Sequence, residues 1–398
     1  MADLRQPADA VQSAQPAGEA RRHELDALRA FAMLLGVGLH AALTFFPSVW
    51  AVQDRTAGYH GPWEELFFAV HGFRMPAFFL LSGFFTAMLW RRRGLPALIR
   101  HRLRRVALPL ALAMATVGPA MDWVVARALG SKAKGFSVHE LLPRLGEFHH
   151  LWFLWMLLWL LGGFLVVAFV ADRVCAQAPG GDGAAQPAWP RWVMWLLIPL
   201  TLLPQLGMAG GGAYPMFGPD TNTGLLPPVH LLAYYAGFFA FGALAYGRQD
   251  RTGALLADTL GRRWRIVLPV SVLAVFPAGL AVTYLPEVRS WAASQVLQVL
   301  YAWGMCLGLI GLFRTLLTRE RPSVRYLADA SYWIYLVHLP LVIGAQIVVR
   351  DWALPSGIKF LLITGGVFAI LLLSYQAFVR YTPIGTLLNG RKRRPAYG

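Results

Sequence analysis

Apolar stretches of about 20 residues alternate with short polar connections along most of this chain. A helix of roughly that length crosses the hydrocarbon core of a bilayer, which is about 30 Å thick. The pattern predicts ten such helices, near residues 27–46, 66–90, 106–125, 151–171, 192–208, 229–246, 266–285, 295–313, 327–349 and 358–379. The connections are too short to hold a separate catalytic domain. The sequence therefore predicts an all-α fold, a polytopic membrane bundle of about ten transmembrane helices, with any chemistry inside the bundle.

Composition supports a membrane protein and limits its partners. Hydrophobic residues make up 57% of the chain and charged residues only 14%. The net charge of +16 would favour a nucleic-acid partner in a soluble protein, but here the Lys and Arg residues gather in alternate connections. With a cytoplasmic N-terminus, inner segments hold 26 of the 36 and outer loops hold 8, while Arg29 and Arg74 fall within helices. Because cytoplasmic segments carry such an excess, both termini are predicted to be cytoplasmic, with the lipid bilayer as a partner and no nucleic acid.

The two ends of the chain differ from its apolar middle. Residues 1–24 are rich in Ala, Gln, Asp and Pro and lack an apolar core, which predicts a disordered cytoplasmic tail. Residues 25–380 form the predicted membrane domain, and residues 381–398 form a basic cytoplasmic tail. Nothing in the first segment resembles a signal peptide, so the first apolar helix is expected to remain uncleaved.

Two polar residues bracket ten uncharged ones in the first helix. Arg29 and His40 are eleven positions apart, which places them within about 20° of one another around the helix and roughly 16 Å apart along it. One face of the helix therefore presents both side chains. The alternative is that Arg29 reaches the inner surface and His40 is a hydrogen-bonded packing residue.

Further polar residues are expected at the depth of His40. Counted at about 1.5 Å per residue from the nearest membrane surface, His40, His71, Arg74 and His338 lie roughly 16–22 Å from the inner side. A buried charge costs about 2.5–3.5 kcal/mol, and no Asp or Glu in the nearby apolar stretches pairs with Arg74. An anion or a water-filled cavity should therefore meet it. Histidine suits proton transfer near neutral pH, although these histidines would also serve to bridge helices.

Other polar clusters allow two interpretations each. The histidines suggest no metal site, because there is no His-Glu-x-x-His motif and no carboxylate at this depth, and His149 and His150 are expected at the outer interface. The glycine-rich segment 207–228 is either a lid or a linker.

The arginines between Arg91 and Arg105 also allow two interpretations. They either mark an inner loop or form a phosphate site, in which Arg102 and Arg105, one turn apart, bind a polyphosphate.

Several of these residues occur in motifs of a known family. The motifs are Arg29 followed by ten residues and His40, His71-Gly-Phe-Arg74-Met-Pro76, Arg102-x-x-Arg105, Leu151-Trp152-Phe-Leu, and Ser331-Tyr-Trp-Ile-Tyr335-Leu-Val-His338. Together they resemble the membrane-bound type 3 acyltransferase family from about residue 23 to 380. The chain is most similar to the glucan-biosynthesis branch, which succinylates osmoregulated periplasmic glucans.

The resemblance implies a multi-pass enzyme of the bacterial inner membrane. It would be an O-acyltransferase that takes an acyl group, succinyl or acetyl, from cytoplasmic acyl-coenzyme A and delivers it to a periplasmic glycan, with no permanently bound cofactor. The family's essential histidine falls on His40, its preceding arginine on Arg29, and its coenzyme-binding arginine pair on Arg102 and Arg105, although Arg100 and Arg104 offer another register.

The expected chemistry leaves several points open. His40 would act as general base for a glycan hydroxyl, with direct acyl transfer preferred over a transient acyl-histidine. His71, Arg74 and His338 complete the expected catalytic set. The acceptor would alternatively be lipopolysaccharide or an exopolysaccharide, and a transporter or flippase also places polar residues at the midplane.

Overall fold

The computed structural model describes residues 22–48, 50–130, 147–176, 191–208, 216–248, 256–317, 319–390 and 392. Every regular element in these ranges is a helix, which confirms the predicted all-α class. The predicted N-terminal tail falls outside the described residues up to position 21, as does most of the C-terminal tail after residue 390.

Fourteen α-helices and five short 3₁₀ or π segments make up the described part of the chain. The α-helices are α1 (His23–Ala42), α2 (Trp63–Arg102), α3 (Leu108–Ala128), α5 (Trp152–Ala176), α6 (Arg191–Leu200), α7 (Leu202–Gln205), α8 (Val229–Ala245), α9 (Leu256–Thr259), α10 (Trp264–Val270), α11 (Phe276–Tyr284), α12 (Trp291–Leu316), α13 (Pro322–Val349), α14 (Ser356–Ser374) and α15 (Pro383–Asn389). The short segments are η1 (Leu103–Ala107), η2 (His149–Leu151), η3 (Ser271–Val275), η4 (Pro286–Val288) and η5 (Tyr375–Val379).

Seven helical segments in the described residues are long and apolar enough to cross a membrane. One of them covers residues 63–128 and contains the two helices predicted near 66–90 and 106–125. The helices predicted near 192–208 and 229–246 correspond to shorter apolar helices at 192–205 and 229–245. Each of the ten predicted ranges therefore overlaps a helix. The number of membrane crossings and the cytoplasmic side of the termini stay predictions.

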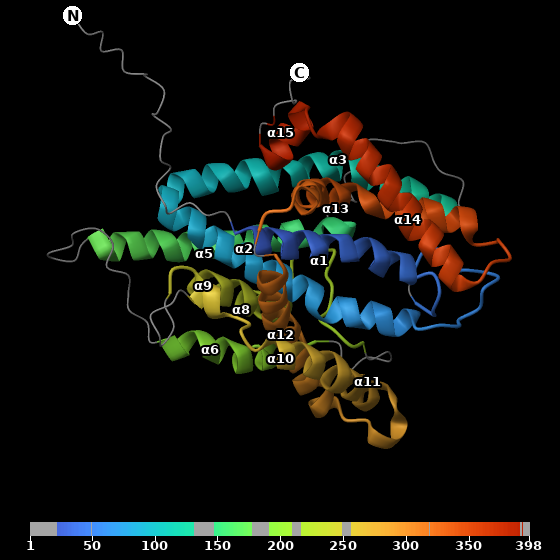
Figure 1. Ribbon diagram of the computed structural model, residues 1–398, viewed down its shortest axis with the longest axis horizontal. Coiled ribbons are helices and arrows are strands. Elements are labelled where there is room, and N and C mark those ends of the chain that lie inside the picture. The colour runs from blue at the N-terminus through green and yellow to red at the C-terminus, as the bar shows by residue number, and fades with distance from the viewer. Residues whose placement is uncertain are drawn as a thin grey trace, which may run out of the picture.

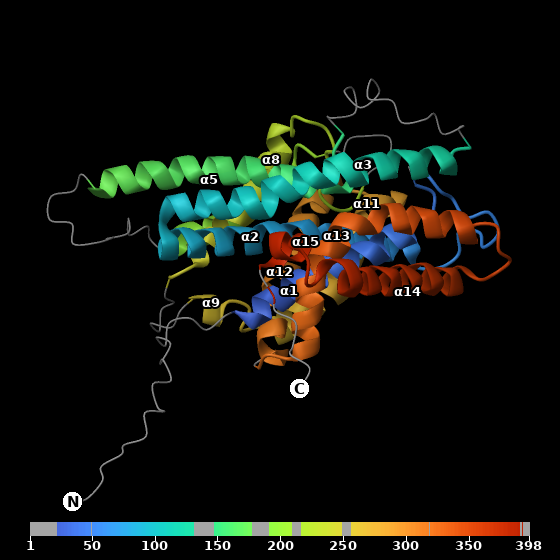
Figure 2. The same ribbon diagram turned by 90° about the horizontal axis from the view of Figure 1, so that it is seen from above.

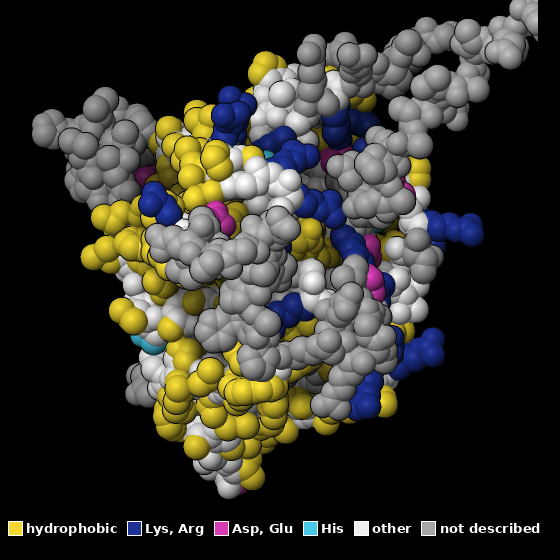
Figure 3. Space-filling model, turned by 90° about the vertical axis from the view of Figure 1, so that its left-hand side faces the viewer, with side chains coloured by type: hydrophobic (Ala, Val, Ile, Leu, Met, Phe, Trp, Pro, Cys, Tyr) yellow, Lys and Arg dark blue, Asp and Glu magenta, His cyan; other side chains and the backbone are white. Residues whose placement is uncertain are grey.

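The long segment changes direction at Gly94. Its φ of 74° and ψ of 175° interrupt the helix, and a positive φ is readily adopted by glycine because it has no Cβ. The chain then turns back through η1 into α3 (Figure 1). The arginines between 91 and 105 all lie at this turn, and we call this end of the bundle the basic end. Figure 3 looks onto the corresponding side of the molecule and shows several Lys and Arg side chains among hydrophobic ones.

Helices α1, α2, α3, α5 and α13 run along the long axis of the molecule in both ribbon views, whereas α12 crosses that axis (Figures 1 and 2). Helix α1 is central and packs against α2, α12, α13 and α14. Helices α2 and α8 approach each other closely where Gly83 faces the backbone of Phe239 and Gly242 faces the backbone of Leu80, so that any larger side chain would collide. Small residues permit this kind of backbone approach in membrane helices.

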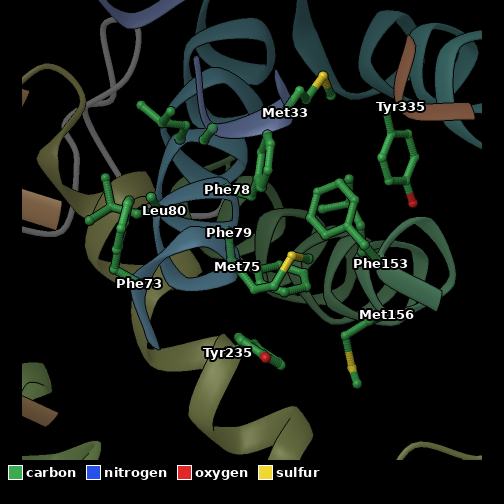
Figure 4. Close-up of a cluster of buried hydrophobic side chains, with 14 of the residues drawn as sticks. Met33, Phe73, Met75, Phe78, Phe79, Leu80, Phe153, Met156, Tyr235 and Tyr335 are labelled. Carbon is green, nitrogen blue, oxygen red and sulfur yellow. The ribbon is translucent and has the colours of Figure 1, made fainter. Parts of the chain in front are cut away.

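The core around α1 is filled by large apolar side chains from several helices. Met33 of α1, Phe78 of α2, Phe153 of α5, Tyr235 of α8 and Tyr335 of α13 gather there (Figure 4). All five are less than 9% exposed, so this packed layer holds the helices that carry the polar residues in a fixed arrangement.

Candidate active site

A cavity of about 1120 Å³ lies at the end of the bundle opposite the basic end. We call this end the cavity end. The walls come from α1, α2, α3, α5, α11 and α13 and from the connections at 43–51 and 216–223. The polar residues that line it include His40, His71, Arg74, His149, His150 and His338. Three helices thus bring together the four residues predicted at one depth, His40, His71, Arg74 and His338.

His40 is held between an aromatic ring and a second histidine. Its ring stacks on Trp50 with centroids 5.7 Å apart and planes 14° apart, and it lies 5.3 Å from the ring of His338. Gln346 fixes this arrangement, because its Oε1 accepts a hydrogen bond from Trp50 Nε1 (2.9 Å) and its Nε2 donates to the His40 carbonyl (2.9 Å). Nδ1 of His40 is buried and has no hydrogen-bond partner in the described part of the chain.

His338 and His71 each donate one ring N–H to a backbone carbonyl. His338 Nδ1 donates to the carbonyl of Tyr335 at 2.8 Å, and His71 Nε2 donates to the carbonyl of Pro219 at 2.8 Å. His71 also stacks on Phe67, with ring centroids 5.1 Å apart. Both histidines are buried, and each hydrogen bond fixes the direction of the ring.

Arg74 lies across the surface of α1 at Gly36. A Cβ at residue 36 would overlap the Nη1 atom of Arg74 and would lie 3.9 Å from Nε2 of His338. The guanidinium makes no salt bridge within the described residues, and its Nε is buried without a hydrogen-bond partner. The absence of an acidic partner agrees with the sequence, and it leaves a cation inside the cavity that can bind an anion or stabilise negative charge.

The prediction that His149 and His150 both lie at the interface is wrong for His150. Its side chain is 8% exposed, and its ring meets that of His338 edge-on, with centroids 5.1 Å apart and planes 86° apart. The reason is η2, a 3₁₀ turn that precedes α5 and directs His150 into the bundle, where its Nε2 donates to the Leu336 carbonyl (3.1 Å). Adjacent residues point in different directions, and His149 lies 3.4 Å from Asp122. The tight turn has no clear sequence signal apart from the Leu151-Trp152 motif that follows.

The described part of the 207–228 segment forms one wall of the cavity. The N–H of Gly218 donates to Gln298 Oε1 (2.8 Å), and the carbonyl of Thr223 accepts from the N–H of Phe148 (2.7 Å). Together with the hydrogen bond that His71 donates to the Pro219 carbonyl, these contacts attach residues 216–223 to three other segments. The choice between lid and linker also concerns residues 209–215, which lie outside the described part.

A buried ion pair anchors the connection that carries Trp50. Lys359 Nζ lies 2.6 Å from Asp54 Oδ2, and the two side chains are 0% and 2% exposed. The other oxygen of Asp54 accepts from the N–H groups of Thr56 and Ala57. Both charges are therefore satisfied by several hydrogen bonds, which fixes residues 54–57 against the first turn of α14.

Arg29 lies away from the cavity, toward the basic end. Its guanidinium stands 5.8 Å from the ring centroid of Phe85, and it lies 3.4 Å from Asp26. The common face predicted for Arg29 and His40 therefore connects two different environments along α1. The Arg29 side chain is 40% exposed and paired with the carboxylate of Asp26, so its charge is neither buried nor alone.

Near Arg29, the arginine-rich turn leaves some of its side chains partly buried, Arg91 among them. Arg102 and Arg105 are partly buried, whereas Arg100 and Arg104 are exposed. Arg102 Nη2 donates to Thr86 Oγ1 (2.7 Å), and the Arg105 carbonyl accepts from the Tyr332 hydroxyl (2.8 Å). The π segment η1 begins directly after Arg102, and such segments recur at functional sites.

Within the described residues, no group of three or more His, Cys, Asp or Glu side chains has an arrangement that suits a metal ion. Histidine side chains offer proton transfer and hydrogen bonding as their chemistry.

Comparison with known proteins agrees with the motifs. A family profile described as an acyltransferase domain, type 3, matches residues 22–378. Curated relatives include the glucans biosynthesis protein C of Salmonella gallinarum, Salmonella paratyphi B and Salmonella agona, each 26% identical over 93% of this chain and 95% of the relative. No solved structure matches significantly. With its apolar helices, the chain is a multi-pass membrane protein, and it belongs to the type 3 acyltransferase family.

Proposed function

We propose that this protein is an O-acyltransferase of the bacterial inner membrane that moves an acyl group from cytoplasmic acyl-coenzyme A to a hydroxyl of a periplasmic glycan. The observation that carries the proposal is the cavity in which His40 and His338 lie beside Arg74, a cation without an acidic partner among the described residues. General bases beside an anion-stabilising group are what acyl transfer to a hydroxyl requires. The name of the relatives, glucans biosynthesis protein C, favours a glucan as the acceptor.

The donor enters from the basic end. Arg102 and Arg105 face inward at this turn, close to Arg29, and arginine binds phosphate through charge-assisted and often bidentate hydrogen bonds. The polyphosphate of the coenzyme would be held there, and the extended pantetheine arm would pass along α1 toward Gly36. Arg29 and His40, roughly 16 Å apart along the helix, mark the two ends of this path.

The acceptor enters from the cavity end, where the connections at 43–51 and 216–223 form the walls. His40 removes the proton of the hydroxyl while the oxygen attacks the thioester carbonyl. Arg74 stabilises the negative charge that develops on the carbonyl oxygen. Direct transfer needs no covalent enzyme intermediate, and trapping an acyl-histidine on His40 by mass spectrometry would favour the two-step alternative.

Arg74 has a competing role in the choice of donor. A dicarboxylic acyl group such as succinyl carries a free carboxylate, which would supply the anionic partner that Arg74 does not have within the described part of the chain. Turnover of wild type and Arg74→Gln with acetyl- and succinyl-coenzyme A separates the two roles. Loss of the preference for succinyl alone indicates carboxylate recognition, whereas an equal loss with both donors indicates stabilisation of the oxyanion.

The decisive test of the proposed function is release of the coenzyme A thiol by the purified protein. An acyltransferase releases the thiol when donor and acceptor are both present. Glucan is the first acceptor to test, and lipopolysaccharide and exopolysaccharide are the others. A transporter or flippase releases none with any acceptor. Mass analysis of the glycans from a deletion strain would then identify the natural acceptor through the loss of its acyl groups.

A further inference from the structure

The hydrogen bond of His338 fixes which of its nitrogens can accept a proton. The Tyr335 carbonyl can only accept, so Nδ1 of His338 must carry the hydrogen of the 2.8 Å bond between them. In the neutral ring, Nε2 is then the nitrogen with the free lone pair. This atom is buried and has no hydrogen-bond partner in the described part of the chain. His338 is therefore held ready to receive a proton at Nε2.

Nε2 of His338 lies on the donor side of His40. The nitrogen is 3.9 Å from the position that a Cβ would occupy at Gly36, the place where the guanidinium of Arg74 also lies. Gly36 precedes His40 by about one turn of α1, toward the basic end. The ring of His40 is stacked on Trp50, which comes from the connection at the cavity end. The two histidines thus offer one base toward each end of the path.

Four aromatic rings follow one another in space. His40 lies between Trp50 and His338, at centroid distances of 5.7 and 5.3 Å, and His150 closes the other side of His338 at 5.1 Å. No direct hydrogen bond joins His40 to His338, and one bridging water is sufficient to pass a proton over such a separation. His150 meets His338 edge-on and uses its own Nε2–H on the Leu336 carbonyl, so it positions the ring of His338.

We propose that His338 is the second proton carrier of the acyl transfer, an assignment that rests on the proposed function. The hydroxyl oxygen forms a bond to the thioester carbon, and His40 receives the hydroxyl proton. The proton passes to Nε2 of His338, the carbon–sulfur bond breaks, and His338 delivers the proton to the departing thiolate. The products are the ester and the free thiol, both histidines return to their neutral forms, and no atom is oxidised or reduced.

The test compares leaving groups that differ in their need for a proton. An alkyl thiolate such as that of coenzyme A is a strong base, whereas a p-nitrothiophenolate is stable without protonation. Transfer to glucan is measured with acyl-coenzyme A and with the p-nitrothiophenyl ester of the same acyl group, using wild type, His338→Gln and His40→Gln. The control is His60→Gln, because His60 is exposed and lies outside the cavity.

We expect His338→Gln to lose on the order of 10²-fold or more in turnover with acyl-coenzyme A, since proton transfer by a positioned side chain contributes about 10²–10⁴-fold. With the activated ester its loss should fall below about tenfold, whereas His40→Gln should remain impaired with both donors. An equal loss of His338→Gln with both donors, or no loss with either, overturns the assignment. Thermal unfolding in detergent separates misfolding from a chemical defect, and a wild-type protein that transfers no acyl group refutes the proposed function itself.

Discussion

At the scale of single residues, substitution of His40 tests whether proton transfer takes place in the cavity. It is the histidine whose ring faces both Trp50 and His338, and its Nδ1 has no hydrogen-bond partner among the described residues. We expect His40→Gln to insert normally, to keep its affinity for acyl-coenzyme A, and to lose on the order of 10²-fold or more in turnover, because glutamine cannot accept a proton at neutral pH. Near-normal turnover would reduce His40 to a positioning role. Steady-state kinetics and donor titration on the same preparation provide the measurement.

Also at this scale, substitution of Gly36 tests whether turnover depends on the position of the Arg74 guanidinium. A methyl group at residue 36 would occupy the place of the guanidinium, while a methyl group at Gly38 would only touch the ring of Phe360 at 3.7 Å. Both changes favour the helix by up to about 1 kcal/mol. We therefore expect Gly36→Ala to lower turnover at least tenfold and Gly38→Ala to leave it within about twofold, with both variants folded by thermal unfolding in detergent. Equal activities would show that Arg74 is displaced without consequence.

At the scale of elements, the turn between α2 and α3 decides which arginines meet the donor. The break at Gly94 and the π segment η1 place Arg102 and Arg105 partly inside and leave Arg100 and Arg104 exposed. We expect Arg102→Ala with Arg105→Ala to weaken the binding of acyl-coenzyme A by at least tenfold, because each phosphate contact is charge-assisted. The matched control removes Arg100 and Arg104 and the same number of charges. Isothermal titration with both double variants distinguishes a binding site from a general excess of positive charge.

At the scale of the whole molecule, the pair of Asp54 and Lys359 joins segments that are 305 residues apart. Removal of one partner leaves the other charge buried, which typically costs about 3–5 kcal/mol, whereas removal of both leaves none. We expect Lys359→Met to lower the unfolding temperature in detergent more than Lys359→Met combined with Asp54→Asn. Turnover should fall in both, because residues 54–57 anchor the connection that holds Trp50 over His40. A double variant as unstable as the single one would mean that the pair contributes mainly through hydrogen bonds to the backbone.

The sequence by itself determined the helical class and most of the polar residues of the site. Each of the ten predicted apolar stretches overlaps a helix, because a helix satisfies its own backbone hydrogen bonds and therefore forms from local sequence in a bilayer. Counting residues along those stretches predicted that His40, His71, Arg74 and His338 share one level, because the rise of a helix is constant, and all four line one cavity. The lack of an acidic partner for Arg74 was visible for the same reason.

Only the tertiary structure decided how these residues combine. The burial of His150 depends on the 3₁₀ turn η2 and on the Leu336 carbonyl of a helix 186 residues away. The free nitrogen of His338 depends on one backbone hydrogen bond, and the space for Arg74 depends on the absence of a Cβ at Gly36. Residues 216–223 form one wall of the cavity and are held there through contacts with Gln298 and His71. Periodicity in one helix contains no information about which neighbouring helix or turn faces it, so the site as a geometric object arises from packing.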